Sequence, residues 1–179
     1  MKPTILAIPG SLRARSSNHA VIATAIALAG DRADFIVYEG LGKLPHFDDS
    51  SQPAETVVAF RKLIADTDGV LICSPEYAFG VPGSLKNALD WTVSSGEFIN
   101  KPVALITAAT GGDKAHASLQ LTLRVISTDL PEQCTLLLSY IRSKMNAAGE
   151  ICDEQTLNEI NQTVNALLAL IKTKQKSDL

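Results

Sequence analysis

The 179-residue sequence lacks the features that would place it in several large functional classes. Its net charge is −3, so it has no basic excess to support non-specific nucleic-acid binding. No apolar stretch reaches the length of a membrane span, and the amino terminus shows no signal-peptide pattern. The cysteines Cys73, Cys134 and Cys152 form no CxxC pair. Their odd number favours reduced thiols in a cytoplasmic protein. From the charge and the short apolar runs we expect no nucleic-acid or membrane partner.

Catalytic and nucleotide-binding signatures are also scarce. The histidines His19, His46 and His116 do not have the spacing of metal ligands, and no nucleophile–base–acid triad stands out. The chain contains neither a GxxxxGK[ST] phosphate loop nor a GxGxxG dinucleotide fingerprint. We therefore expect no metal site, and we assign no catalytic side chain.

Strand-like and helix-like segments alternate along the whole chain. Apolar runs predict strands at 4–9, 33–38, 69–73, 103–108 and 134–138. Helical spacing of apolar residues predicts helices at 18–29, 53–66, 83–93, 114–128 and 153–171. The pattern predicts an α/β fold, a flavodoxin-like doubly wound five-stranded parallel sheet of order 2-1-3-4-5 with helices on both faces. We expect one domain over 1–179, with a polar tail at 172–179 that frays.

A polar loop at 10–18 follows the first predicted strand and precedes the first predicted helix. It offers hydrogen-bond donors suited to a phosphate group: the hydroxyls of Ser11, Ser16 and Ser17, the amide of Asn18 and the guanidinium of Arg13. The helix amino terminus adds free N–H groups and the positive end of its dipole. In the alternative interpretation, Ser17 and Asn18 only cap the helix, and Arg13 and Arg15 are solvated.

A second loop, at 74–83, follows the third predicted strand. Tyr77 and Phe79 stand beside Gly80, and Pro75 and Pro82 restrict the backbone. A stiff loop with aromatic faces and backbone amides suits a flat heterocycle such as an isoalloxazine. The alternative is a tight turn whose aromatic side chains pack into the core.

Together the two loops resemble those of the NADPH-dependent FMN reductase family, in its chromate and quinone reductase branch. That family carries GSLRxxSxN and PEYNxSxPGxLKNAxDW, where this chain has GSLRARSSN at 10–18 and PEYAFGVPGSLKNALDW at 75–91. The resemblance implies a flavodoxin-like fold and non-covalent FMN. It also implies an oxidoreductase that uses NADPH or NADH as co-substrate to reduce a small-molecule electron acceptor.

Carried over by position, the resemblance assigns three groups of cofactor-binding residues. Those of the first loop, near the phosphate, are Ser11, Arg13, Ser16, Ser17 and Asn18. Those of the second loop, near the flavin, are Pro75, Glu76, Tyr77, Ala78 and Phe79. A third loop resembles the family more loosely and contributes Ala109, Thr110 and Gly111.

The chain departs from the family pattern at Ala78, where asparagine is common, and at Gly80, where a serine is common. These departures leave the acceptor open among quinones, free flavin, azo compounds and metal oxyanions. We expect ping-pong hydride transfer. Two other functions remain possible: a flavodoxin-like electron carrier without NAD(P)H activity, or an α/β binding module without flavin.

The resemblance also implies a homo-oligomer, either a homodimer or a homotetramer. We expect the partner to pack against the helix that bears Leu85, Leu89 and Trp91 and so to wall the site. In the alternative interpretation Trp91 belongs to the core of its own chain.

Overall fold

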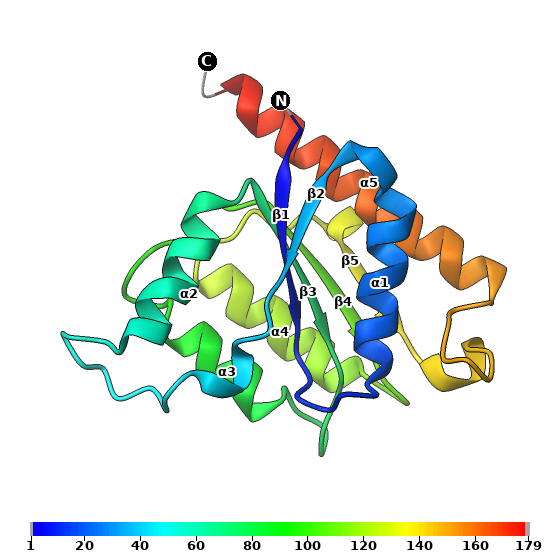
Figure 1. Cartoon of the computed structure of the whole chain (residues 1–179), viewed down its shortest axis with the longest axis horizontal. Coiled ribbons are helices and arrows are strands. Elements are labelled where there is room, and N and C mark those ends of the chain that lie inside the picture. Colours follow the sequence, from blue (N-terminus) through cyan, green and yellow to red (C-terminus); the bar gives the residue numbers. More distant parts are fainter. Residues whose placement is uncertain (1, 178–179) are drawn as a thin grey trace.

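A computed structural model describes residues 2–177, and its centre is a single parallel sheet (Figure 1). The strands are β1 (Thr4–Pro9), β2 (Asp34–Val37), β3 (Gly69–Ser74), β4 (Val103–Ala108) and β5 (Thr135–Leu138). Their order is β2-β1-β3-β4-β5, and all neighbouring pairs are parallel. The predicted fold class and strand order are therefore confirmed.

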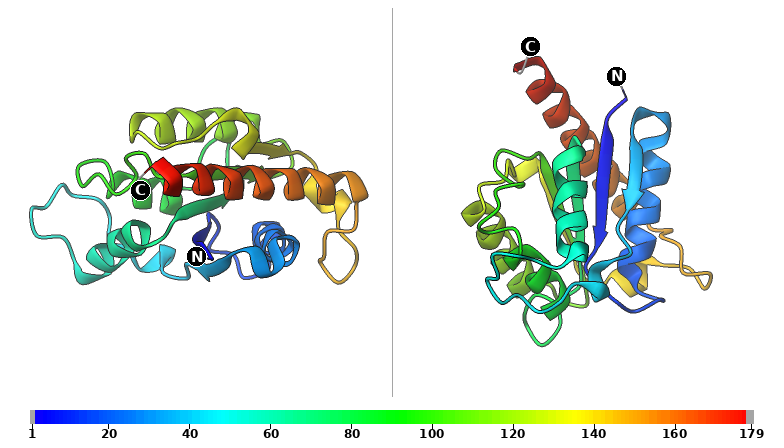
Figure 2. Two further views of the ribbon diagram at one scale, coloured as in Figure 1. Left: turned by 90° about the horizontal axis from the view of Figure 1, so that it is seen from above. Right: turned by 60° about the vertical axis from the view of Figure 1, so that its left-hand side comes forward.

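Five helices cover the two faces of the sheet: α1 (Ser17–Ala29), α2 (Glu55–Asp66), α3 (Gly83–Asp90), α4 (Asp113–Val125) and α5 (Glu154–Ser177). Helices α1 and α5 pack on one face, and α2, α3 and α4 pack on the other (Figure 2). Successive strand side chains point to opposite faces, so Ile5 and Ala7 join the first core while Leu6 and Ile8 join the second. Burial on both faces explains why the strands read as unbroken apolar runs.

Helix α5 ends later than the sequence predicted. It continues through Ser177, so the helix end predicted at 171 was wrong, and residues 172–177 of the predicted frayed tail belong to the helix. The extension is held by polar contacts, because Lys174 Nζ donates to the carbonyl of Asn100 (2.6 Å) and Gln175 Nε2 donates to Asp68 Oδ1 (3.0 Å). The remainder of the predicted frayed tail, 178–179, lies outside the described residues.

The predicted partner contact through α3 was also wrong. Leu85, Leu89 and Trp91 are almost fully buried within their own chain. The Trp91 indole donates Nε1–H to the carbonyl of Pro45 (2.8 Å) and meets the Phe47 ring edge-on, with 5.1 Å between ring centroids. These side chains therefore serve the core and are not available to a second subunit.

Over the described residues, every helix is too short or too polar to cross a lipid bilayer.

Candidate cofactor-binding site

Three loops meet at the carboxyl ends of the central strands β1, β3 and β4, the edge where ligands bind in open α/β sheets. A cavity of about 290 Å³, hereafter the cofactor cavity, opens between them. Most of the predicted binding residues line it: Arg13, Ser16, Ser17, Asn18, Pro75, Glu76, Tyr77, Ala109 and Thr110. Ser11, Ala78, Phe79 and Gly111 do not. The lining also includes Arg15, Ala108, Ile141 and Arg142, which the sequence analysis did not assign.

The first loop reaches the cavity through a close backbone approach at Gly10. Its N–H donates to the carbonyl of Cys73 at 2.7 Å. A Cβ at this position would lie 2.9 Å from Leu85 Cδ2 and 3.2 Å from that carbonyl oxygen. The absence of a side chain thus lets the chain leave β1 against the end of β3.

Helix α1 begins at the cavity with donors that remain free. Ser16 is the N-cap, and its hydroxyl oxygen accepts hydrogen bonds from the Asn18 N–H (3.3 Å) and from Asn18 Nδ2 (3.2 Å). A hydroxyl can accept two bonds and still donate one, so the Ser16 O–H remains available. Within residues 2–177 the Ser17 hydroxyl has no hydrogen-bond partner, so it is a second free donor at the positive end of the helix dipole.

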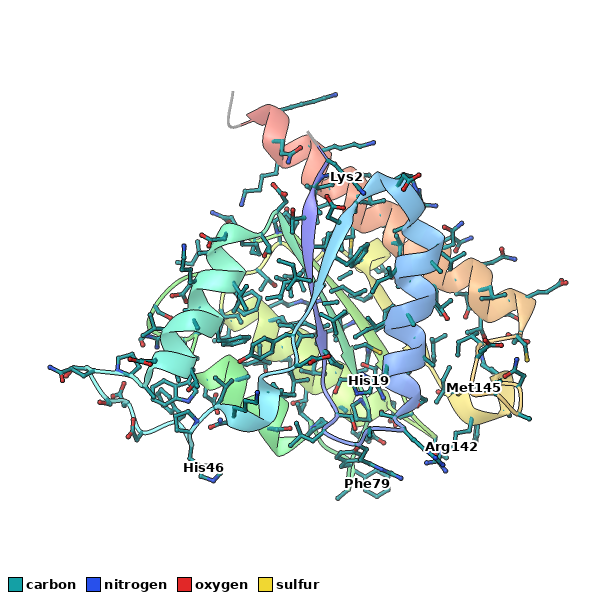
Figure 3. All side chains as sticks on the ribbon, viewed as in Figure 1. Lys2, His19, His46, Phe79, Arg142 and Met145 are labelled. Atoms are coloured by element: carbon teal, nitrogen blue, oxygen red, sulfur yellow. The ribbon has the colours of Figure 1, made fainter. Side chains whose placement is uncertain are left out.

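Three arginines give the cavity its charge. Arg13, Arg15 and Arg142 all line it, and all are exposed. None of the three guanidinium groups has an ion pair or a hydrogen bond to another described residue. Figure 3 shows Arg142 at the lower edge of the molecule, close to the amino-terminal end of α1. The cavity therefore concentrates unpaired positive charge, as a phosphate site requires.

The side chain of Asn18 is fully engaged inside the protein. It is buried, and its Nδ2 donates to the carbonyl of Ala108 (3.3 Å) as well as to Ser16. Its Oδ1 accepts from the thiol of Cys73 (3.1 Å). Asn18 thus joins the first loop to the end of β4, and its amide has no hydrogen left to donate to a ligand.

Two further side-chain contacts link the second loop to its neighbours. Ser11 Oγ and the Tyr77 hydroxyl are 2.9 Å apart and join the second loop to the first. The Glu76 carboxylate accepts from the N–H groups of Gly112 (3.2 Å) and Ala115 (2.9 Å), which joins it to the third loop. With the Asn18 contact, every pair of the three loops is connected. We call these three connections the loop links.

Glu76 also completes the amino terminus of α4. The N-cap of that helix is Gly112, which has a φ of 107° and no side chain to offer. The carboxylate arrives from the second loop and accepts the Ala115 N–H, which an N-cap side chain would satisfy, as well as the N–H of Gly112 itself. It also carries the negative charge that the helix dipole favours there. Glu76 is therefore committed to structure, and it is not a free base beside the cavity.

The tip of the second loop is a two-residue turn in an unusual conformation. Tyr77 and Gly80 exchange backbone hydrogen bonds of 3.0 Å in both directions. Between them Ala78 and Phe79 have φ values of 49° and 59°, the left-handed region that a type I′ turn requires. Neither residue is the Asn or Gly usual there, so the turn is strained. Phe79 is 80% exposed and does not pack into the core, which excludes that alternative interpretation for this ring.

Backbone donors remain on the second and third loops. Within the described residues, the N–H groups of Ala78, Phe79, Thr110 and Gly111 have no hydrogen-bond partner. They stand on the two loops that follow β3 and β4. Such amides are the donors that the edge of a flavin ring requires.

The titratable groups near the sheet are held neutral. Burial raises the pKa of the Cys73 thiol far above its usual range, and burial also raises the pKa of Cys134 to about 11. Burial lowers the pKa of His116, whose ring nitrogens meet Thr107 Oγ1 (2.8 Å) and Gln120 Nε2 (3.0 Å). Both buried cysteines therefore act as small core residues, and neither is a thiolate nucleophile. Over the described chain, no cluster of His, Cys, Asp or Glu could hold a metal ion.

These observations test whether FMN fits the residues present. The phosphate of FMN is a dianion, and the cavity offers guanidinium groups, two free hydroxyls and a helix amino terminus. The one carboxylate in the lining, Glu76, is already bonded to two backbone N–H groups. The ring needs amide donors and a flat wall, which the second and third loops supply. The donor set therefore fits FMN.

The fold and the cavity define a flavodoxin-like protein with a positively charged cavity at the carboxyl edge of its sheet. The chain belongs to the NADPH-dependent FMN reductase family, which matches residues 3–140. It is therefore an oxidoreductase of the FMN- and NAD(P)H-dependent type, as the sequence predicted.

Individual relatives agree with this assignment. The chain is 31% identical over 179 residues to the 2-hydroxy-1,4-benzoquinone reductase of a Burkholderia species, covering 96% of this chain and 97% of the relative. It is 40% identical over 138 residues to an NADPH azoreductase from a Bacillus species, covering 72% of each. Among solved structures, FerB, a flavoenzyme NAD(P)H:(acceptor) oxidoreductase from Paracoccus denitrificans, is similar with a TM-score of 0.84 at 28% identity. That match covers 96% of this chain and 98% of FerB.

Proposed function

We propose that this protein binds FMN in the cofactor cavity and catalyses ping-pong electron transfer from NAD(P)H to a small acceptor. The acceptors proposed are quinones, free flavin, azo compounds or metal oxyanions. The observation that carries the proposal is the cavity itself, with three unpaired arginines and the free donors of α1 at the carboxyl edge of the sheet. The relatives named as benzoquinone reductase and azoreductase support the first and third acceptor classes.

The residues of the chain would divide the work of binding. Arg13, Ser16 and Ser17 line the cavity with free donors and would hold the phosphate. Pro75, Glu76, Tyr77, Ala109 and Thr110 line the opposite wall. The backbone amides of Ala78, Phe79 and Gly111 lie on the same loops and would reach the ring.

Ser11 and Asn18 would act by holding the loops in place, because their side chains are bonded within the protein. When bound, the flavin supplies the redox chemistry, and the chain supplies binding, orientation and exclusion of water. No side chain is required as a general acid or base.

The visible spectrum of the purified protein provides the first test of this function. A flavin spectrum, either as purified or after addition of FMN, is the expected result, and a protein that stays colourless and takes up no FMN would overturn it.

Steady-state oxidation of NADPH and NADH is then measured over a panel of the four acceptor classes. Double-reciprocal plots at several acceptor concentrations should be parallel, while intersecting lines would require both substrates to be bound together. Bound flavin without NAD(P)H oxidation would favour the electron carrier.

We also propose a homo-oligomer, a homodimer or a homotetramer, with a contact face different from the one first expected. Ile99, Leu121 and Val125 are 58%, 62% and 77% exposed. Asn100 donates its N–H to the carbonyl of Ser127 at 2.8 Å, so the segment around Ile99 lies beside the end of α4. These side chains form an apolar surface that a second copy of the chain would cover.

Light scattering at micromolar concentration measures the assembly. We expect a mass of at least two chains, and Val125→Glu should lower the mass to that of one chain because it places a charge in the contact. A wild-type protein with the mass of one chain and full reductase activity would refute the oligomer.

We further propose that residues 1–179 form one FMN-binding domain that works in the cytoplasm, where its free cysteines would stay reduced.

A further inference from the structure

A second and larger cavity adjoins the cofactor cavity on the side of α1 and the segment that follows β5. Its volume is about 700 Å³. It shares Arg15, Ser16, Ser17 and Arg142 with the cofactor cavity, so the two spaces adjoin at these residues. We call it the adjoining cavity. Figure 3 shows Met145, one of its wall residues, near Arg142 at the same side of the molecule.

The far wall of the adjoining cavity is built as a closed turn. Met145 and Ile151 pair as an antiparallel bridge. Between them Asn146 donates its N–H to the carbonyl of Glu150 (2.9 Å), and its side-chain amide donates to Glu150 Oε2 (2.9 Å). The Glu150 carboxylate is thereby engaged by an amide. The wall is fixed by its own hydrogen bonds, as a binding surface requires.

The positive charge around the cofactor cavity exceeds the negative charge of one phosphate. A phosphate monoester carries about −1.5 to −2 charges at neutral pH. Arg13, Arg15 and Arg142 supply three positive charges, and the α1 amino terminus adds a partial one. None of the three arginines has an acidic partner among the described residues. With Arg13 assigned to the FMN phosphate, Arg15 and Arg142 are available to bind a second anionic group.

The rest of the adjoining cavity is suited to a flat apolar group. Ala14 and Ala20 line it from the α1 side, and Met145, Asn146, Ala147, Ala148 and Gly149 line it from the turn. The alanines and the flexible thioether of Met145 leave room for a planar base, and Asn146 adds a polar group to this wall. Guanidinium groups together with a wall of small side chains match a ligand that joins a phosphate to a purine.

We propose that the adjoining cavity binds the adenosine 2′-phosphate end of NADPH and that Arg15 and Arg142 make the enzyme select NADPH over NADH. This inference rests on the proposed function, since it assigns a place to the co-substrate of that reaction. The chain contains no dinucleotide fingerprint, so the 2′-phosphate is read by side chains and not by a glycine-rich loop. Because the two cavities adjoin at Arg15 and Arg142, the far end of a nucleotide held there would lie beside the cavity proposed for the flavin.

Calorimetric titration of the holoenzyme tests the site without turnover. The probes are adenosine 2′,5′-bisphosphate, adenosine 5′-monophosphate and inorganic phosphate. We expect the bisphosphate to bind at least tenfold more tightly than either other probe, because only it carries both the 2′-phosphate and the base. Equal affinities for the bisphosphate and the monophosphate would overturn the proposal. Equal affinities for the bisphosphate and inorganic phosphate would also overturn it, since the cavity would then be a general phosphate site.

Three variants locate the binding. Arg142→Gln should weaken bisphosphate binding about tenfold, the loss of one charge-assisted hydrogen bond. Ala148→Glu, which lies outside the cofactor cavity, should weaken it similarly by repulsion and lower the ratio of kcat/KM for NADPH to that for NADH. Arg124→Gln is the matched control, because Arg124 is an exposed arginine of α4 that lines neither cavity. Bisphosphate binding that is unchanged in both Arg142→Gln and Ala148→Glu would refute this location.

The outcomes separate this proposal from the function on which it rests. FMN binding is measured by the flavin absorption spectrum, and binding of adenosine 2′,5′-bisphosphate is measured by the heat released in the calorimetric titration. If the protein takes up no FMN, the proposed function fails, and the same titration on the purified protein still decides whether the adjoining cavity recognises a 2′-phosphate. If FMN binds and the bisphosphate does not, the reductase stands and the adjoining cavity is not a nucleotide site.

Discussion

Replacing Arg13 by alanine tests the proposed phosphate site with little risk to the fold. The guanidinium is exposed and has no partner among the described residues, so its removal breaks no internal contact. The two contacts that shape the loop here are made by the backbone. The Arg13 N–H donates to Ser11 Oγ (3.2 Å), and the Arg13 carbonyl accepts from the Ser16 N–H (3.0 Å). Alanine keeps both contacts.

The expected cost falls on FMN affinity alone. A hydrogen bond to a charged group contributes about 1.5–3 kcal/mol, which corresponds to a rise in Kd of roughly 10- to 150-fold. The lower end is favoured because Arg13 is exposed and because Arg15 and Arg142 remain in the lining. The difference between variant and wild type should shrink as ionic strength rises, since solvent-exposed charges are screened.

The assay is a fluorescence titration of FMN with the apo-protein at low and high salt. Arg124→Ala provides the control, because it removes the same charge from a surface that lines neither cavity. The urea midpoint of Arg13→Ala should equal that of the wild type. If the Kd of Arg13→Ala stays within twofold of the wild-type value while the fold is intact, Arg13 is not a phosphate ligand.

Three further predictions concern the loops and the sheet edge. Glu76→Ala should lower the free energy of unfolding by about 1–2 kcal/mol, because it leaves the N–H groups of Gly112 and Ala115 without an acceptor. Glu76→Gln keeps an acceptor and should lose less, and urea titration measures both variants. Burial lowers the pKa of His116, so the unfolded chain binds the proton more readily than the folded chain. The free energy of unfolding of the wild type should therefore fall as pH drops below about 6.5. His116→Gln should lose less of that free energy over the same pH range. Ala78→Asn should raise the unfolding free energy by up to about 1 kcal/mol, since asparagine tolerates the left-handed conformation, and an unchanged thermal midpoint would show that the turn stores no strain.

The architecture was predictable because both faces of the sheet are covered. A strand that is buried on both faces is an unbroken apolar run in the sequence, and each segment between two strands carries apolar residues at helical spacing. The end of α5 was not predictable, because it depends on Lys174 and Gln175 meeting Asn100 and Asp68. Those partners are separated by 74 and 107 positions in the sequence. Polar residues at the end of a chain look alike in sequence whether or not they find such partners.

The candidate site was predictable as a set of loops but not as a set of contacts. The spacing of serines and arginines before a helix indicated a phosphate site, and the cavity forms there. The spacing could not show that the amide of Asn18 is used inside the protein or that Glu76 caps α4. Arg142 was missed because it follows β5, far from either motif. The only available signal was its place after the last predicted strand, where parallel topology brings chain ends to the same edge.

The loop links also bear on how such a site can change. All three attach at Ser11, Asn18, Glu76 and Tyr77, whereas Ala78 and Phe79 stand at a turn tip that none of the links includes. Side-chain changes at the tip therefore break none of the three links. The tip is the segment where this chain departs from its family, at Ala78 and Gly80. In a protein built in this way, the side chains of one exposed turn can vary while the connections between the loops are kept.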